Sequence, residues 1–219
     1  MKNIFKHHNL VIILMHHLLL AYGLFTYGFN IWIALAVFAY AILYNVVING
    51  QLIHLRMAHG GYKDGLIERF ATLYSLIGGG TGSPLGFAYV HRMHHRFVDT
   101  PKDPHSPKYL GKFKVWFLFW RLGPLNPSYI KDYVASPFQM WMHRHWTKLQ
   151  LLSLAILWII NPLIVVFIVS PTVVATLHFS GFINVRGHWY GEVRNIPEIM
   201  FTQPASWKHK VHHDTKYTV

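Results

Sequence analysis

The sequence predicts an all-α integral membrane protein with four transmembrane helices, arranged as two hairpins, and a helical cap in the cytoplasm. The first observation is two long stretches without a charged residue, 9–49 and 149–185. The second is that all 20 Lys and Arg residues lie outside these stretches. The third is a set of histidine clusters, each beside an apolar stretch rather than inside it. Since the chain has 219 residues, we expect a single domain over 1–219.

Each uncharged stretch is long enough for a helical hairpin, because one span needs about 20 apolar residues and the stretches contain 41 and 37. Gly28-Phe29-Asn30 is the expected turn of the first hairpin. Asn161-Pro162 and Ser170-Pro171 are candidate turns of the second. We favour Ser170-Pro171, which leaves a first span of proper length; Pro162 would then kink that helix. The predicted spans are 10–29, 31–49, 149–169 and 171–185.

Two hairpins place the N-terminus and the segments 50–148 and 186–219 on one side of the membrane. These parts hold every basic residue, and an excess of Lys and Arg marks the cytoplasmic side. We therefore expect an integral membrane protein with both termini in the cytoplasm. The net charge is +12, but the 53% apolar content indicates membrane lipid, and not nucleic acid, as the partner of these charges.

Three histidine clusters fall in the predicted cytoplasmic segments. They read His54-Leu-Arg-Met-Ala-His59, His91-Arg-Met-His94-His95 and His209-Lys-Val-His212-His213. Histidine is the commonest metal ligand among side chains, and the chain has no cysteine. A random scatter of histidines is the alternative, but an HxxHH pattern that occurs twice argues against it. The cap is therefore expected to carry a nitrogen-rich metal site, and imidazole suits iron, copper, zinc and nickel.

The spacing within each cluster predicts how a helix would present it. Residues three and four apart share one helix face, so each HxxHH cluster can direct three imidazoles into one pocket. His54 and His59 are five apart and would lie about 140° apart on a regular α-helix. Both can reach one metal only at a distorted helix end, or with the metal between them. Gly60-Gly61 follows directly, which predicts that the pair lies at the tip of a helix.

The motifs resemble those of membrane-bound fatty-acid desaturases, the delta-9 type in particular, over nearly the whole chain. The segment from His91 to Ser106 resembles the second histidine box of that family, and the segment from His54 to Lys63 resembles the first. Asn184-Val-Arg-Gly-His188-Trp-Tyr-Gly191 is similar to the NxxxHxxG element that precedes the last box. From the residues alone, His188 could equally be a core histidine. The resemblance implies metal ligands at His54, His59, His91, His94, His95, His188, His209, His212 and His213, with Asn184 acting through a water.

The resemblance also implies an activity, an O₂-dependent fatty-acyl desaturase that inserts a cis double bond into an acyl chain linked to CoA, acyl carrier protein or a lipid. Two iron ions would be the cofactor, O₂ the co-substrate, and ferredoxin or cytochrome b5 the external electron donor. No catalytic residue beyond the metal ligands is implied. Removing hydrogen from an unactivated alkyl chain needs an oxidant stronger than any side chain, which independently requires a metal cofactor.

Lys108 and Lys112 follow the second box on the predicted cytoplasmic side. We expect them to bind the phosphates of the substrate's head group as point charges. Solvated lysines at the membrane interface are the alternative.

Two other functions fit parts of the pattern. A di-iron membrane hydroxylase or ketolase of lipid or carotenoid substrates shares the architecture, but such hydroxylases tend to have HxxxH where this chain has HxxxxH. A non-enzymatic membrane metal-binding protein would place its histidines inside the spans. Only His16, His17 and His178 come near that position.

Overall fold

The computed structural model describes residues 8–78, 82–117, 124–196 and 209–214. Every regular element within these ranges is helical, and no strand occurs among them, which confirms the all-α prediction. The elements are α1 (His8–Tyr27), α2 (Ile31–Tyr44), η1 (Asn45–His59), α3 (Leu66–Gly78), α4 (Pro84–Phe97), α5 (Pro107–Leu110), α6 (Lys112–Trp116), η2 (Pro127–Tyr129), α7 (Lys131–Val134), α8 (Pro137–Ile160), α9 (Pro162–Ile164), η3 (Val165–Val169), α10 (Ser170–Gly187), η4 (Trp189–Gly191) and α11 (His209–Asp214).

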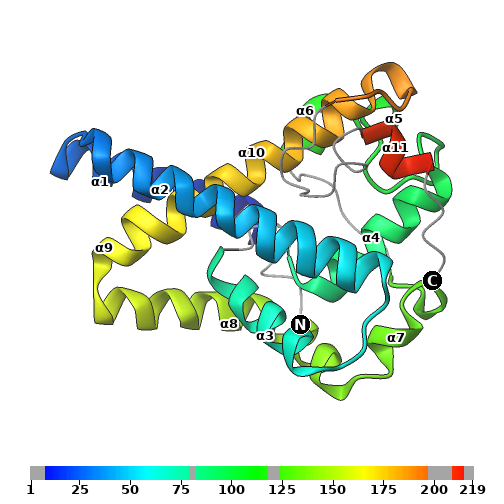
Figure 1. Cartoon of the computed structure of the whole chain (residues 1–219), viewed down its shortest axis with the longest axis horizontal. Coiled ribbons are helices and arrows are strands. Elements are labelled where there is room, and N and C mark those ends of the chain that lie inside the picture. Colours follow the sequence, from blue (N-terminus) through cyan, green and yellow to red (C-terminus); the bar gives the residue numbers. More distant parts are fainter. Residues whose placement is uncertain (1–7, 79–81, 118–123, 197–208, 215–219) are drawn as a thin grey trace.

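The long helices and the short ones occupy different ends of the molecule. The helices α1, α2 and α10 cross near its middle, and α8 forms a separate arm that joins α10 through α9 (Figure 1). The short helices α5, α6, α7 and α11 lie at the far end from the α8–α9 corner, together with α4 (Figure 1). The helices α4, α5, α6, α7 and α11 form the cap, which is therefore assembled from segments that are far apart in the sequence.

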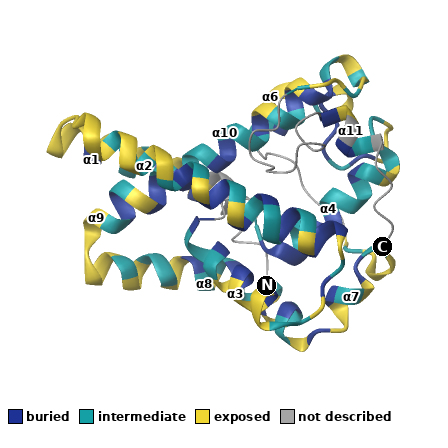
Figure 2. Cartoon of the chain, in the orientation of Figure 1, coloured by how far each residue is buried: buried dark blue, intermediate teal, exposed yellow. Residues whose placement is uncertain are grey.

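Two helices are long and apolar enough to cross a membrane, Ile31–His59 and Pro162–Gly191, and Val11–Tyr27 is a shorter apolar helix. Many large apolar side chains of α1, α2 and α8 face outward. Phe25 is 93% exposed, Trp32 75% and Ile159 83%, and exposed positions run along α1, α2 and α8 (Figure 2). An aqueous surface rarely carries so much contiguous apolar area, whereas lipid would cover it. The four-span arrangement itself stays a prediction.

The predicted turn of the first hairpin is confirmed. Helix α1 ends at Tyr27, and Gly28 takes the left-handed φ of 73° that glycine tolerates best. The side chain of Asn30 then accepts hydrogen bonds from the backbone N–H groups of Trp32 (3.0 Å) and Ile33 (3.2 Å). Asparagine is a preferred residue at this capping position, and it starts α2 at the expected place.

The favoured turn of the second hairpin, Ser170-Pro171, is wrong. The chain turns at Asn161, whose φ of −164° and ψ of 112° break the helix, and its side chain caps Leu163 N at 2.9 Å. Pro162 begins the next helix because a first-turn proline has no N–H to satisfy. Pro171 continues that helix, because the preceding turn widens to π-type bonding, with Ser170 N bonded to Val165 O. The boundaries predicted at 169 and 171 therefore do not hold.

The second span also extends further than predicted. The helix that starts at Ile31 does not end near residue 49 but continues as η1 to His59. Gly60 N bonds to Leu55 O at 2.9 Å and Gly61 has a φ of 81°, so the glycine pair ends the helix as expected. The first histidine box therefore lies at the tip of a long helix that starts in the apolar region.

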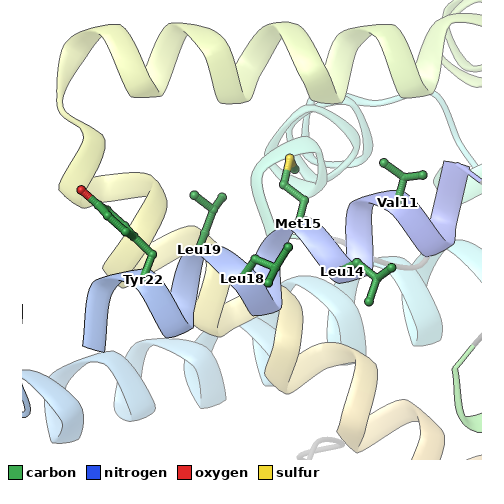
Figure 3. Close-up of a pocket in the computed structure, with 6 residues that line it drawn as sticks. All are labelled: Val11, Leu14, Met15, Leu18, Leu19 and Tyr22. Carbon is green, nitrogen blue, oxygen red and sulfur yellow. The ribbon is translucent and has the colours of Figure 1, made fainter. Parts of the chain in front are cut away.

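An apolar pocket of about 500 Å³ lies along α1, and the residues that line it are Val11, Leu14, Met15, Leu18, Leu19 and Tyr22. These side chains project from successive turns of the helix (Figure 3). Histidines 16 and 17 belong to the same helix but do not line the pocket. The pocket thus belongs to the apolar end of the molecule and not to the cap.

Candidate metal centre

All nine histidines predicted as metal ligands converge in the cap, with their Nε2 atoms facing one another. They come from four places in the fold: the end of η1, helix α4, the residue after α10, and α11. Between neighbouring histidines of the cluster, the Nε2–Nε2 distances are 2.8–3.3 Å. Ligands that share one first-row metal ion at about 2.1 Å lie roughly 3 to 3.5 Å from one another. The spacing therefore fits ligands gathered around metal ions.

The first group contains the two histidines of η1. His54 Nε2 lies 2.8 Å from His91 Nε2, 3.1 Å from His59 Nε2 and 3.2 Å from His212 Nε2. These four can hold one metal ion by the geometry of their nitrogen atoms. His95 joins the same side through His212, with its Nε2 at 3.0 Å.

The second group contains the histidine that follows α10. His188 Nε2 lies 2.8 Å from His209 Nε2 and 3.1 Å from His94 Nε2, and His94 Nε2 lies 3.3 Å from His213 Nε2. His94, His188 and His213 form a further set that can hold one ion. Helices α4 and α11 contribute to both groups, so each HxxHH cluster is divided between two adjacent groups and does not form the single pocket that its spacing predicts.

The helix type of η1 explains how the HxxxxH spacing works. Residues 45–59 form a π-type helix, in which each N–H bonds to the fifth preceding carbonyl. Residues five apart therefore come closer to one face than the 140° of an α-helix allows. The ring centroids of His54 and His59 are 4.8 Å apart. The distortion that the sequence required thus runs through the whole box and is not confined to its last residue.

Two carboxylates behind the second group fix the orientation of its imidazoles. His94 Nδ1 donates to Asp103 Oδ2 at 2.8 Å, and His188 Nδ1 donates to Asp99 Oδ2 at 2.8 Å. Because an ionised carboxylate only accepts hydrogen bonds, each Nδ1 carries the proton and each Nε2 carries a lone pair. Carboxylates that hold metal-bound histidines in this way strengthen metal binding.

The turn after α4 is built to bring these carboxylates back to the histidines. Asp99 takes a left-handed φ of 53°, which aspartate tolerates better than most residues. Its backbone N–H donates to Asp103 Oδ2 at 3.0 Å, and Ser106 Oγ donates to Asp99 Oδ1 at 2.8 Å. Asp103, His105 and Ser106 are buried, and the rings of His105 and His94 stack 4.1 Å apart.

The electrostatics of the cluster favour neutral imidazole, the form that binds metals. Burial, reinforced by neighbouring histidines, lowers the pKa of His91 and His94 well below the usual value. Burial also lowers the pKa of His95 to about 4 and that of His209 to about 3. With both Nδ1 protons directed at the aspartates, the Nε2 lone pairs of His94 and His188 face each other at 3.1 Å. Lone pairs repel at this distance, and a cation between them removes the repulsion, so the donor set fits a metal.

The other residues singled out in the sequence lie at varying distances from this cluster. Asn184 is partly buried in α10, one turn before His188, and its role at a metal stays a prediction. Lys108 and Lys112 are exposed on α5 and α6. Lys112 Nζ lies 3.4 Å from the ring centroid of Trp189, the neighbour of His188. Both lysines are thus on the same side as the second group.

The histidines nearest the apolar helices have hydrogen-bond partners of their own. His16 Nδ1 lies 3.0 Å from Ser170 Oγ. His17 Nε2 lies 3.2 Å from His178 Nε2, and Trp116 Nε1 donates to His178 Nδ1 at 3.0 Å. Such bonds between helices are typical of polar side chains in apolar surroundings. They account for these histidines without a metal.

Sequence reasoning missed the two aspartates. The segment 99–106 reads as an acidic turn, and its signal was available: two aspartates in a proline-rich turn directly after a histidine box. Histidine ligands usually need a partner at the second ring nitrogen, and this turn is the nearest source of one.

We predict that His209→Ala lowers the metal content of the purified protein and nearly abolishes turnover, because its Nε2 lies 2.8 Å from His188 Nε2 in the second group. The control is His145→Ala, since His145 on α8 bonds to Trp141 O within its own helix. Metal per protein is measured by mass spectrometry of the elements. Full metal content in the His209 variant would remove this residue from the ligand set.

Comparison with known proteins gives a consistent result, although no family model matches the chain. The chain is 29% identical to the Delta-9 desaturase-like 2 protein of Arabidopsis thaliana over 155 residues, which cover 68% of this chain and 49% of that protein. It is 24% identical to the acyl-CoA 5-desaturase AL21 of Anemone leveillei, with coverage of 92% and 67%. A second Anemone leveillei protein, the acyl-CoA C20 Delta5-desaturase, is 22% identical, with coverage of 86% and 64%.

The chain thus spans about half the length of the Arabidopsis relative that it matches. The similarity is modest but extends over most of this chain in the two Anemone proteins. It agrees with the histidine cluster and the apolar helices found in the structure. Together, these relatives support the assignment of the chain to a fatty-acid desaturase family.

Proposed function

We propose that this chain is an O₂-dependent fatty-acyl desaturase that inserts a cis double bond, of the delta-9 type, into a carrier-linked acyl chain. The observation that carries the proposal is the pair of histidine groups, whose Nε2 atoms face one another at 2.8–3.3 Å. The names of the relatives, which include acyl-CoA and delta-9 desaturases, support the reaction. Two iron ions would occupy the two groups.

The chain's own residues have defined tasks in this proposal. The nine histidines would hold the iron ions, and Asp99 and Asp103 would keep the rings of His188 and His94 oriented. Asn184 would act through a water one turn before His188. When bound, the iron ions would supply the oxidant, made from O₂, that an unactivated methylene pair requires. The buried position of His54, His94 and His188 keeps bulk water away from such a reagent.

The substrate and the electron donor must both reach the cap. The acyl chain would lie with one methylene pair at the metal centre. An external donor, ferredoxin or cytochrome b5, would deliver two electrons. The basic segments around the histidines would attract an acidic donor. These partners follow from the proposed reaction and the charge of the chain.

We also propose the four-span topology with the metal centre and both termini in the cytoplasm. The support is the position of the charges: residues 9–49 and 149–185 contain none, and every Lys and Arg lies in the remaining segments. The outward-facing apolar side chains of α1, α2 and α8 agree with a lipid environment.

The activity test uses the purified, iron-loaded protein in lipid nanodiscs with O₂, a reduced donor and an acyl substrate. We predict a product with one cis double bond, detected by gas chromatography with mass spectrometry, and no product without O₂. A hydroxylated product would show that the protein is a hydroxylase and not a desaturase. Bound metal without any product would favour a non-enzymatic metal-binding protein.

The topology test attaches a reporter to each terminus. We predict that both reporters are accessible only from the cytoplasmic side, because two hairpins return the chain to the side on which it starts. A terminus that reports the outer face would contradict the four-span arrangement.

The head-group test reverses the charge of both lysines. We predict that Lys108→Glu with Lys112→Glu raises KM for the acyl substrate by about tenfold or more and leaves the iron content unchanged, because two point charges facing phosphates are lost. The control is Lys131→Glu with Lys148→Glu, two exposed lysines on α7 and α8. An equal KM in both double variants would mean that Lys108 and Lys112 are only solvated interface residues.

A further inference from the structure

Every N–H group of the Arg92 guanidinium donates a hydrogen bond where the two histidine-bearing helices α4 and η1 meet. Arg92 lies in α4 between His91 and His94. Its Nε donates to Ala58 O at 2.8 Å, and its Nη2 donates to Met57 O at 3.3 Å. Its Nη1 donates to Tyr129 O at 2.9 Å. The carboxylate of Asp132 accepts two further bonds, at 2.7 and 2.8 Å, so all five N–H donors of the side chain have partners.

These partners place Arg92 at the end of the helix that carries the first histidine box. Met57 and Ala58 lie in the last turn of η1, between His54 and His59, where helix carbonyls lack partners within the helix. A cation is also favourable at this end of a helix dipole. Asp132 extends the contact, because it accepts a bond from Tyr62 N at 2.7 Å just after the helix ends.

The arrangement is rigid and largely shielded from water. The side chains of Arg92 and Asp132 are 12% and 19% exposed, and the guanidinium lies 5.5 Å from the ring centroid of Tyr133. Tyr133 and Met57 are buried in the adjoining core. The bidentate pair with Asp132 has one favoured geometry, and it orients the guanidinium whose other N–H groups bond to Ala58 O and Met57 O of η1.

We propose that Arg92 and Asp132 are positioning residues for the first metal ion, the one held by His54, His59, His91 and His212. Neither side chain is itself a ligand. Arg92 holds the backbone of η1 in the position relative to α4 in which His54 Nε2 and His91 Nε2 lie 2.8 Å apart. The proposal rests on the metal centre proposed above and adds that its two ions have separate supports.

Other residues orient the histidines of the second metal ion, so the two ions are expected to respond differently to the loss of Arg92. His94 and His188 are oriented by Asp103 and Asp99, and the residues that Arg92 contacts belong to η1, to η2 and to α7. Loss of Arg92 should therefore disturb the first ion and leave the second in place. Loss of Asp103 should have the opposite effect.

The experiment measures metal per protein and metal affinity in the full chain, with the wild type at two ions as reference. Arg92→Ala and Asp132→Ala are expected to retain about one ion, with affinity for the other reduced 10- to 100-fold or more. Asp103→Asn should reduce the affinity for the second ion and leave the first ion bound. Arg96→Ala is the matched control, because Arg96 lies one turn further along α4, is exposed, and has its guanidinium near the rings of Phe97 and Tyr129.

Cobalt loading gives a second readout that shows which site is lost. Co²⁺ titrated into the metal-free protein should bind in two phases, one for each site. Arg92→Ala should lose the absorption band of the first site and keep that of the second. Asp103→Asn should lose the band of the second site and keep that of the first. Arg92→Lys, which keeps the charge but not the fork of donors, should show the same selective loss in milder form and should remain folded. Loss of both ions together, or of neither, overturns the proposal. A wild type that binds no metal would instead overturn the proposed function.

Discussion

The cap depends on one constraint, the convergence of nine imidazole rings whose Nε2 atoms lie 2.8–3.3 Å from those of their neighbours. In the second group the tautomers are set by Asp99 and Asp103, so the Nε2 lone pairs of His94 and His188 point together at 3.1 Å. Burial keeps the histidines of α4 neutral and prevents protonation from relieving the contact. A bound metal would replace this repulsion by attraction between the cation and the Nε2 lone pairs.

The fold is organised to bring four distant segments to that point. The helix η1 carries its two histidines beyond the apolar region, α10 ends just before His188, and α4 supplies histidines to both groups. Helix α11 has six residues, too few for a stable helix in isolation. Three of them, His209, His212 and His213, face the other histidines. If these histidines bind metal as proposed, metal binding and the ordering of this segment would be coupled.

Much of the site was predictable from the sequence, because histidine spacing is a local property. The three boxes and His188 do converge, and Gly60-Gly61 does end the helix of the first box. Span length favours a turn at Ser170-Pro171, but the capping side chain of Asn161 and the first-turn proline Pro162 place the turn at Asn161. The π-type bonding of η1 could not be read from the sequence pattern. The same is true of Arg92, whose role depends on carbonyls more than thirty residues away.

The proposed centre contains two metal ions held only by imidazole nitrogens and water. X-ray absorption at the iron edge of the purified, iron-loaded protein shows which atoms surround the metal. We expect nitrogen neighbours at roughly 2.1 Å, a strong outer-shell pattern from imidazole rings, and a second iron in the same centre. A first shell dominated by carboxylate oxygen, without the imidazole pattern, would contradict it.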